Sequence, residues 1–318
     1  NYILRKPNPS ANRQGWVKWL MGLKPPVHAY YISDRDDNGF RALSELKNRG
    51  INKVANALAQ SVDHILSFFK MLRTELAFYL GCYNLHKQLA QIGEPVCFPQ
   101  PLPADGHSRS FQGLYDVCLA LTIQEKTVGN DITAEHKDLV IITGANQGGK
   151  STFLRSIGQS QLMMQCGMFV GAISFSASVC NGLFTHYKRE EDASMNSGKL
   201  DEELSRMNGI VDNLKPDALV LFNESFAATN EREGSEIARQ IVCALVEKGI
   251  QVLFVTHLYD FAHTFYNLSM DKVLFLRAER GNDGERTFKI IPGPPLQTSF
   301  GQDLYNKIFK SDSCSYGN

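Results

Sequence analysis

The sequence has no excess charge of either sign and no long apolar run, and each lack narrows the possible functions. Lysine plus arginine number 33, and aspartate plus glutamate also number 33. This balance argues against a surface covered with DNA-binding charge, although a local basic patch would not change the sum. No apolar run approaches the roughly 20 residues that a membrane-spanning helix requires. We therefore expect a globular chain outside the membrane, and a composition of 43% hydrophobic and 21% charged residues agrees.

Paired cysteines are also lacking. The seven cysteines are scattered without a C-x-x-C pair, which suits a reducing cytoplasm better than a disulfide framework or a zinc site. No signal peptide is visible, and the chain begins with Asn1 rather than methionine. We interpret the chain as a piece of a longer protein, or as a chain whose start is missing, and we expect it in the cytoplasm.

The first third of the chain contains one long helical pattern. Apolar residues recur at three- and four-residue spacing from Ile51 to Ile92, and no proline follows until Pro95. This pattern predicts an amphipathic helix of about 60 Å at 1.5 Å per residue. Such a helix fits a core helix or half of a coiled coil, and it also fits a lever that joins two parts of a protein.

Residues 93–109 are rich in proline and glycine and predict a domain boundary. Residues 1–107 would form a mainly helical lever or connector, and residues 108–318 a second domain. In that domain apolar strands alternate with helices, which predicts an α/β fold with a mostly parallel sheet flanked by helices. The strand candidates are 139–143, 218–223, 252–256, 272–276 and 287–291, and the helix candidates are 150–164, 200–213 and 233–248.

A glycine-rich loop follows the first of these strands. The segment GANQGGKST at residues 144–152 has the pattern G-x-x-x-x-G-K-S between an apolar strand and a helix. Such a loop lets backbone N–H groups surround phosphates at a helix N-terminus. Lys150 would neutralise the β- and γ-phosphates of ATP, and the Ser151 hydroxyl would bind Mg²⁺. The predicted phosphate-binding residues are Gly144, Asn146, Gly148, Gly149, Lys150, Ser151 and Thr152.

A second strand ends in two polar residues, Asn223 and Glu224. ATPases that use a carboxylate for hydrolysis usually have Asp-Glu here, where the Asp supports Mg²⁺ and the Glu polarises the attacking water. Glu224 is therefore the predicted general base. Asn223 can accept from a metal-bound water but brings no negative charge, so Mg²⁺ affinity should fall and hydrolysis should slow.

A third strand ends at Thr256 and is followed by His257. Taken alone, such a histidine is more often structural. Its place relative to the two preceding motifs favours a catalytic role, in which it senses the γ-phosphate or the attacking water.

These motifs, in this order, resemble the MutS family of DNA mismatch-repair ATPases. The loop at 141–152 is similar to that family's P-loop, including its asparagine, and 255–257 resembles its A-T-H switch. Residues 221–225 and 229–234 occupy the place of its Walker B and signature segments. Val128 and Asn130 lie where the family contacts adenine, and residues 191–199 resemble a mobile loop. The resemblance covers about 110–305 and extends in part to the preceding helix.

The resemblance implies a P-loop NTPase fold of the ABC-like kind over 108–318 and a lever before it. It also implies a dimer in which each ATP, with Mg²⁺, lies between one subunit's P-loop and the other's signature loop. The residues of that loop are Thr229, Asn230 and Arg232. ATP would then control a DNA clamp formed largely by regions outside this chain, and the DNA would be mismatched or branched. The family's mismatch-reading domain is not in this sequence, and Asn230 stands where mismatch-repair members have a serine.

Two other classes of function are compared with this one. A transporter-type or chromosome-structure ATPase would carry an L-S-G-G signature, and this sequence has none. A nucleotide-gated dimerisation module would bind ATP with little or no hydrolysis, and Asn223 favours that alternative.

Overall fold

The computed structural model describes residues 2–4, 28–30, 35–188, 198–268, 270–281 and 286–296. The chain divides into two compact units, Asn1–Tyr79 and Leu80–Asn318, and the division falls within one helix. The predicted division at residue 107 stays a prediction. The predicted mobile loop at 191–199 lies almost wholly outside the described residues. None of the helices in the described part combines the length and apolar character that crossing a membrane requires.

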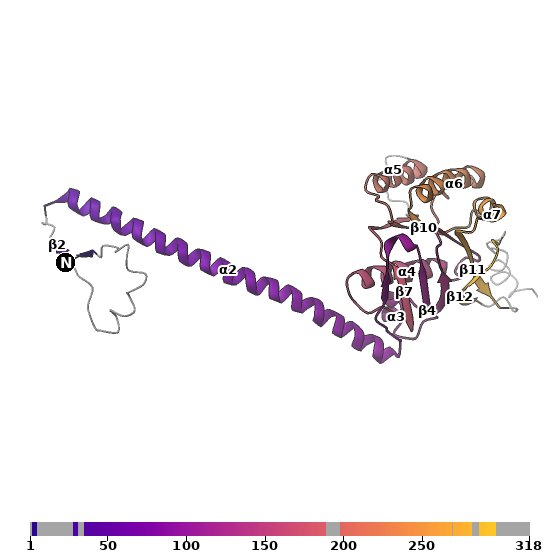
Figure 1. The fold of residues 1–318 in the computed structure, drawn as a ribbon, viewed down its shortest axis with the longest axis horizontal. Helices are drawn as coiled ribbons and strands as arrows, with labels where there is room; N and C mark the ends of the chain where they lie inside the picture. The colour runs from indigo at the N-terminus through magenta and orange to yellow at the C-terminus, as the bar shows by residue number, and fades with distance from the viewer. Residues whose placement is uncertain are drawn as a thin grey trace, which may run out of the picture. The chain divides into compact units, whose positions relative to one another are not determined.

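The first unit contains a pair of short strands and most of a long helix. Strands β1 (Tyr2–Leu4) and β2 (His28–Tyr30) pair antiparallel. Helix α2 (Asp37–Ile92) has 56 residues, about 84 Å at 1.5 Å per residue. It begins well before the predicted start at Ile51, because the residues from Asp37 onwards also contain no proline and follow Asp36, whose side chain accepts from the Gly39 N–H at 2.9 Å. Figure 1 shows α2 as one uninterrupted helix.

The second unit is built on a six-stranded sheet in the order β12-β11-β6-β10-β9-β8. All neighbouring pairs are parallel except β11 and β12, which are antiparallel. The predicted α/β class with a mostly parallel sheet is therefore confirmed. The strands are β6 (Leu139–Thr143), β8 (Leu183–Tyr187), β9 (Leu219–Asn223), β10 (Gln251–Val255), β11 (Val273–Arg280) and β12 (Arg286–Pro292).

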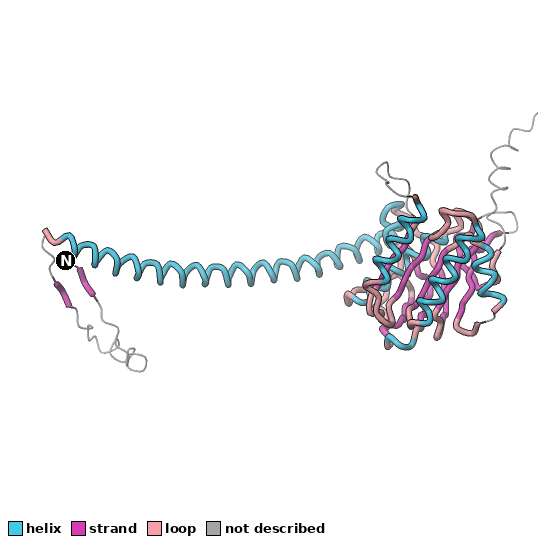
Figure 2. Tube along the Cα trace, turned by 90° about the horizontal axis from the view of Figure 1, so that it is seen from above, coloured by secondary structure: helices cyan, strands magenta, loops and turns pink. Residues whose placement is uncertain are grey.

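Helices cover both faces of this sheet (Figures 1 and 2). Alternate residues of the central strands, such as Val140 and Ile142, pack on α4 (Lys150–Gln165). Their neighbours Leu139 and Ile141 pack in a second core with α5 (Lys199–Val211), α6 (Glu231–Glu247) and α7 (Tyr259–Asn267). Burial on both faces explains why these strands are continuous apolar runs. Because helices cover both faces of the sheet, they leave the edge formed by the carboxyl ends of the strands uncovered, and the polar residues of the motifs lie there.

A second, four-stranded sheet in the order β3-β7-β4-β5 is absent from the sequence-based prediction. Its strands are short and partly polar, so their apolar content is too low to stand out. It lies on the α4 side of the main sheet, because Phe111 and Phe175 join the core that contains α4. The strands of this sheet are β3 (Gln100–Leu102), β4 (Arg109–Leu114), β5 (Asn130–Ala134) and β7 (Ser174–Ser178). Two short helices, η1 (Ala104–Gly106) and α3 (Val117–Ile123), lie between these strands in the sequence.

A charged cluster joins the two sheets at the amino ends of the strands. The His107 ring lies between two carboxylates, with Nδ1 2.5 Å from Asp138 and Nε2 3.3 Å from Asp217. The Lys272 ammonium lies 3.0 Å from the other oxygen of Asp138. Burial alone would raise the pKa of the Asp138 carboxyl, but the hydrogen bonds from His107 and Lys272 outweigh it and hold that pKa below its ordinary value.

We expect Asp138→Asn to lower the free energy of unfolding at pH 7 by about 1–3 kcal/mol, because it weakens charged hydrogen bonds to a mostly buried group. The lowered pKa means that the carboxylate stabilises the fold above the ordinary aspartate pKa of about 3.9 and loses this effect as pH falls through the folded-state value. Urea unfolding of both proteins from pH 7 to pH 3 measures this. A difference that stays constant over that range would contradict a role for the charge.

Candidate functional site

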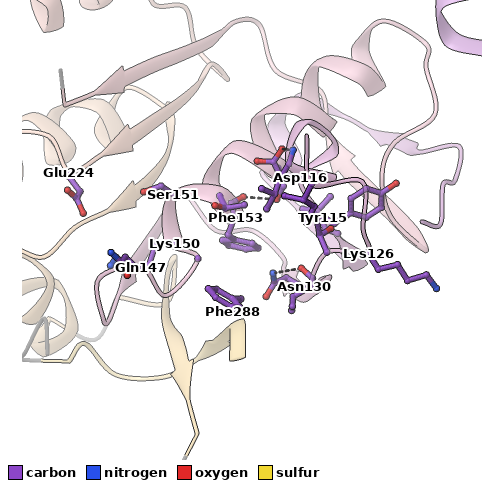
Figure 3. A pocket seen from close by; sticks show the side chains of 18 residues that line it. Tyr115, Asp116, Lys126, Asn130, Gln147, Lys150, Ser151, Phe153, Glu224 and Phe288 are labelled. Atoms are coloured by element: carbon purple, nitrogen blue, oxygen red, sulfur yellow. Dashed lines mark hydrogen bonds between the residues drawn. The ribbon is translucent and has the colours of Figure 1, made fainter. Parts of the chain in front are cut away.

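A cavity of about 480 Å³ opens at the carboxyl ends of the main strands. Its size is within the roughly 300–1,000 Å³ of small-molecule sites. The loop and first turn after β6 form one end, together with Glu224. Residues around α3 and β5 form the other end, with Phe153 and Phe288 between them (Figure 3). One end is therefore polar and charged, and the other is mainly apolar.

The polar end is built on the glycine-rich loop. Gly144 and Gly149 have φ of +115° and +89°, which a residue with a side chain adopts only with strain. Gly149 is also the N-cap of α4, so no side chain caps the first N–H groups of that helix. These N–H groups and the helix dipole favour an anion at this point.

Lys150 is the buried cation of this end. Its side chain is 4% exposed, and its ammonium donates to the carbonyl oxygens of Gly144 and Ala145 at 2.9 Å each. Burial lowers the pKa of Lys150, and the nearby charge of Glu224 opposes that shift. The loop thus holds a charged donor in place at the cavity wall with only carbonyl partners, which an anionic ligand can replace.

Ser151 and Asn223 meet beside this end. The Ser151 hydroxyl donates to the Asn223 side-chain oxygen at 2.7 Å. The two strands involved, β6 and β9, both flank β10 in parallel, so their carboxyl ends lie close together. The pair places two neutral oxygen ligands together, which suits a hard cation such as Mg²⁺ but adds no negative charge.

Glu224 lines the cavity from the turn after β9 (Figure 3). Its backbone has φ of +52°, in the left-handed region that is unfavourable for a residue with a Cβ, and Phe226 has φ of +62°. The Glu224 N–H donates to the Val255 carbonyl of β10 at 2.9 Å. A carboxylate held in this way at the polar end could accept a proton from water.

The apolar end is held by contacts from distant parts of the chain. Val128 lines it, and the buried Asn130 uses its side-chain oxygen to accept from the Ile290 N–H of β12 at 2.7 Å. Glu94, just after α2, accepts from the N–H and hydroxyl of Thr127 at 2.6 and 2.8 Å. The loop with Val128 is thus fixed between the end of α2 and β12, and its apolar surface suits a flat ring.

Not every predicted site residue lines this cavity. Gly149, Lys150, Ser151, Thr152, Val128, Asn130 and Glu224 do, whereas Gly144, Asn146 and Gly148 do not. His257 is exposed and borders a separate, small cavity with Thr143 and Tyr259. Asn230 is the N-cap of α6, accepting from the Glu233 N–H at 2.9 Å, and Arg232 is exposed on the first turn of that helix.

Eleven of the 18 lining residues were missed at the sequence level, and three of them come from segments far from the glycine-rich loop in sequence. Phe288 reaches the cavity from β12 with φ of +57°, and Tyr115 and Lys126 come from the segments beside α3. Another residue of β12, Arg286, donates to the Gln147 side chain of the glycine-rich loop at 2.6 Å. No motif marks these positions, because each joins the site only through contacts between segments distant in sequence.

Comparison with known protein families gives two matches. Residues 140–308 match MutS domain V, and residues 1–92 match the MutS2 N-terminal domain. The domain V match covers more than half of the chain and contains the loop, Asn223 and Glu224. The chain belongs to the MutS family. The family resemblance read from the motifs is thereby confirmed, and the chain carries the family's C-terminal ATPase domain.

Individual proteins of the MutS family are also similar to this chain. The chain is 28% identical over 290 residues to the DNA mismatch repair protein MutS of Lactobacillus delbrueckii subsp. bulgaricus, a match that covers 86% of this chain and 34% of that protein. It is 29% identical over 152 residues to human MutS protein homolog 4, covering 48% of this chain and 16% of that protein. The chain thus spans about a third of the length of the bacterial relative.

Proposed function

We propose that this chain is the ATP-binding and ATP-hydrolysing part of a MutS-family protein, with the P-loop NTPase fold of the ABC-like kind. The observation that carries the proposal is the cavity whose polar end joins the helix-capping loop, Lys150, Ser151 and Glu224. ATP would place its phosphates there and its adenine at the end with Val128 and Asn130. Domain V membership supports the same assignment.

Mg²⁺ would be held by Ser151 and Asn223, whose side chains meet at 2.7 Å. It would supply positive charge against the phosphates when bound. Glu224 would act as general base toward water, since it lines the cavity near Lys150. His257 would sense the γ-phosphate from the end of β10, where it borders a small cavity together with Gly144 of the loop.

The biological setting of the reaction is also a proposal. The relatives named as DNA mismatch repair proteins suggest that the whole protein binds DNA, mismatched or branched, through regions largely outside this chain. The long helix α2, with Glu94 just beyond it bonded to Thr127, would connect the nucleotide site to those regions. Binding of the full-length protein to homoduplex, mismatched and branched DNA, with and without ATP, tests this proposal.

An alternative is a nucleotide-gated dimerisation module with little or no hydrolysis. Asn223 favours it, because the metal site lacks the usual carboxylate. The two proposals differ in one measurement, the single-turnover rate of ATP hydrolysis against a Glu224→Gln control. Hydrolysis that depends on Glu224 supports the ATPase, and ATP binding without such hydrolysis supports the alternative.

We expect Asn223→Asp to raise the apparent Mg²⁺ affinity. A unit charge 4 Å from the cation contributes about 4 kcal/mol at an effective dielectric of 20, before desolvation is subtracted. A net gain on the order of tenfold, about 1.4 kcal/mol, is the expected outcome. A magnesium titration of ATP binding measures it. Asn208→Asp, on the exposed surface of α5, is the matched control, and equal behaviour of the two variants would place Asn223 away from the metal.

We expect ATP to favour a homodimer in which Thr229, Asn230 and Arg232 face the other subunit's phosphates. A ligand that bridges two subunits stabilises the associated state by mass action. Sedimentation with and without a non-hydrolysable ATP analogue measures the shift. Arg232→Ala should weaken it by removing a charged donor. Asn230→Asp is the second variant, since aspartate keeps the helix cap but removes the amide donor.

One outcome would contradict the proposed dimer in which ATP bridges the two subunits. If the analogue saturates the site and the protein stays monomeric, the proposal is wrong for this chain. Equal dimerisation of the Arg232 variant and the wild type would remove that residue from the interface.

A further inference from the structure

A buried polar cluster bonds to the turn that carries Glu224, and none of its residues lines the cavity. It consists of His186 on β8, Glu203 on α5 and Ser225, which follows Glu224 in the chain. Their exposed fractions are 0%, 4% and 0%. Burying such groups is costly unless each is hydrogen-bonded. The burial of three polar side chains at one place therefore indicates a structural or functional role for the cluster.

Hydrogen bonds from this cluster reach two consecutive residues of the turn after β9, Ser225 and Phe226. The Ser225 hydroxyl lies 2.7 Å from His186 Nδ1 and 2.7 Å from the His186 carbonyl oxygen. His186 Nε2 lies 3.0 Å from the Glu203 carbonyl oxygen, to which it donates. The Glu203 carboxylate accepts from the Phe226 N–H at 2.9 Å. The His186 ring also stacks on Phe226, with ring centroids 5.2 Å apart.

These contacts hold a strained backbone. Glu224 and Phe226 both have positive φ, +52° and +62°, and each such residue costs on the order of 1–3 kcal/mol unless its surroundings impose the conformation. Three consecutive residues are each fixed by a different element: Glu224 by β10, Ser225 by β8 and Phe226 by α5. Without these bonds the turn could relax to negative φ, and the Glu224 carboxylate would then point elsewhere.

We propose that Glu203, His186 and Ser225 are positioning residues that fix the turn and thereby aim the Glu224 carboxylate into the nucleotide cavity. The inference rests on the proposed function and adds three residues to it that do not touch the nucleotide. Lys150 and Ser151 belong to the first turn of α4, and their side chains hydrogen-bond to residues outside the cluster, so the cluster affects hydrolysis and leaves ATP binding unchanged. Glu203 fixes the turn through a carboxylate oxygen that accepts from the Phe226 N–H. The negative charge of that carboxylate is not required for this role. Burial raises the pKa of the Glu203 carboxyl, which agrees with a site that does not demand charge.

The test compares Glu203→Gln with Glu203→Met in single-turnover ATP hydrolysis and equilibrium ATP binding. Glutamine keeps an acceptor oxygen, so its rate should stay within about threefold of the wild type. Methionine has similar length but no acceptor of comparable strength, so its rate should fall roughly 10- to 100-fold, the scale expected for a reacting group displaced by about 1 Å. Ser225→Ala, a milder change, should also slow hydrolysis. ATP affinity should stay within about twofold in all three, because the phosphate loop is untouched.

A second arm separates positioning from general loss of structure. Each variant is combined with Glu224→Gln, and assays are run well below every melting temperature. If the cluster acts through Glu224, Glu203→Met should add no further slowing to Glu224→Gln. An equal slowing in both backgrounds would overturn the proposal, and so would a full rate in Glu203→Met. A Glu203→Gln rate as low as that of Glu203→Met would overturn the claim that an acceptor suffices.

Failure of the proposed function gives a different pattern. A wild-type chain whose hydrolysis is undetectable, or is unchanged by Glu224→Gln alone, overturns the ATPase assignment and this inference together. Hydrolysis that depends on Glu224 but not on Glu203 or Ser225 leaves the ATPase intact and overturns only the positioning role.

Discussion

Glu224→Gln should lower the single-turnover rate of ATP hydrolysis by about 10²–10⁴-fold, the usual contribution of a general base. Glutamine has nearly the same shape but cannot take a proton from water. ATP affinity should be spared or slightly raised, because a negative charge near the phosphates is removed. Rapid mixing of excess protein with labelled ATP, followed by acid quench, measures the rate independently of product release.

The control for this variant is Glu247→Gln, at the exposed end of α6. It should hydrolyse ATP at the wild-type rate. A Glu224 variant that loses affinity and rate by the same factor would indicate a structural role for this carboxylate. A variant that retains the full rate would require another base, and His257 would then be the first residue to test.

Lys150→Ala should reduce ATP affinity by about 10²–10⁴-fold. Each hydrogen bond to a charged group contributes about 1.5–3 kcal/mol, and one ammonium can make two such bonds to phosphate oxygens. The Lys150 ammonium already lies at the cavity wall with its donors directed to the Gly144 and Ala145 carbonyls, so little reorganisation is needed when phosphate replaces them. Fluorescence anisotropy of a labelled ATP analogue measures the loss.

Lys215→Ala is the matched control, because this lysine is exposed just before β9. It removes the same charge from the chain without touching the loop. Circular dichroism should show that both variants are folded. Wild-type affinity in a folded Lys150→Ala protein would contradict the assignment of the phosphate end.

The sequence predicted the parts of the candidate site that are local in the chain. The glycine-rich loop could be predicted because its glycines, Lys150 and Ser151 are contiguous and lie between an apolar strand and a helix. Glu224 could be predicted because a buried strand ends beside it. Ser151 and Asn223 were both assigned to Mg²⁺ from their motifs; their side chains meet at 2.7 Å, and their role at a metal stays a prediction.

Other parts depend on contacts that no local pattern encodes. The resemblance associates Asn130 with adenine, and that role stays a prediction; the bond that holds its side-chain oxygen comes from Ile290, a residue 160 positions away. The short strands of the second sheet were missed because they are partly polar and pair out of sequence order. The cluster of His186, Glu203 and Ser225 was equally invisible, since its three residues come from β8, α5 and a turn and meet only after the sheet has formed.

The most direct test of the account is a calorimetric titration of the wild-type chain with ATP in the presence of Mg²⁺. We expect saturable binding of one ATP per chain, lost in Lys150→Ala and retained in Glu224→Gln. Undetectable binding by the folded wild-type chain, or binding that survives Lys150→Ala unchanged, would contradict the claim that this cavity is an ATP site.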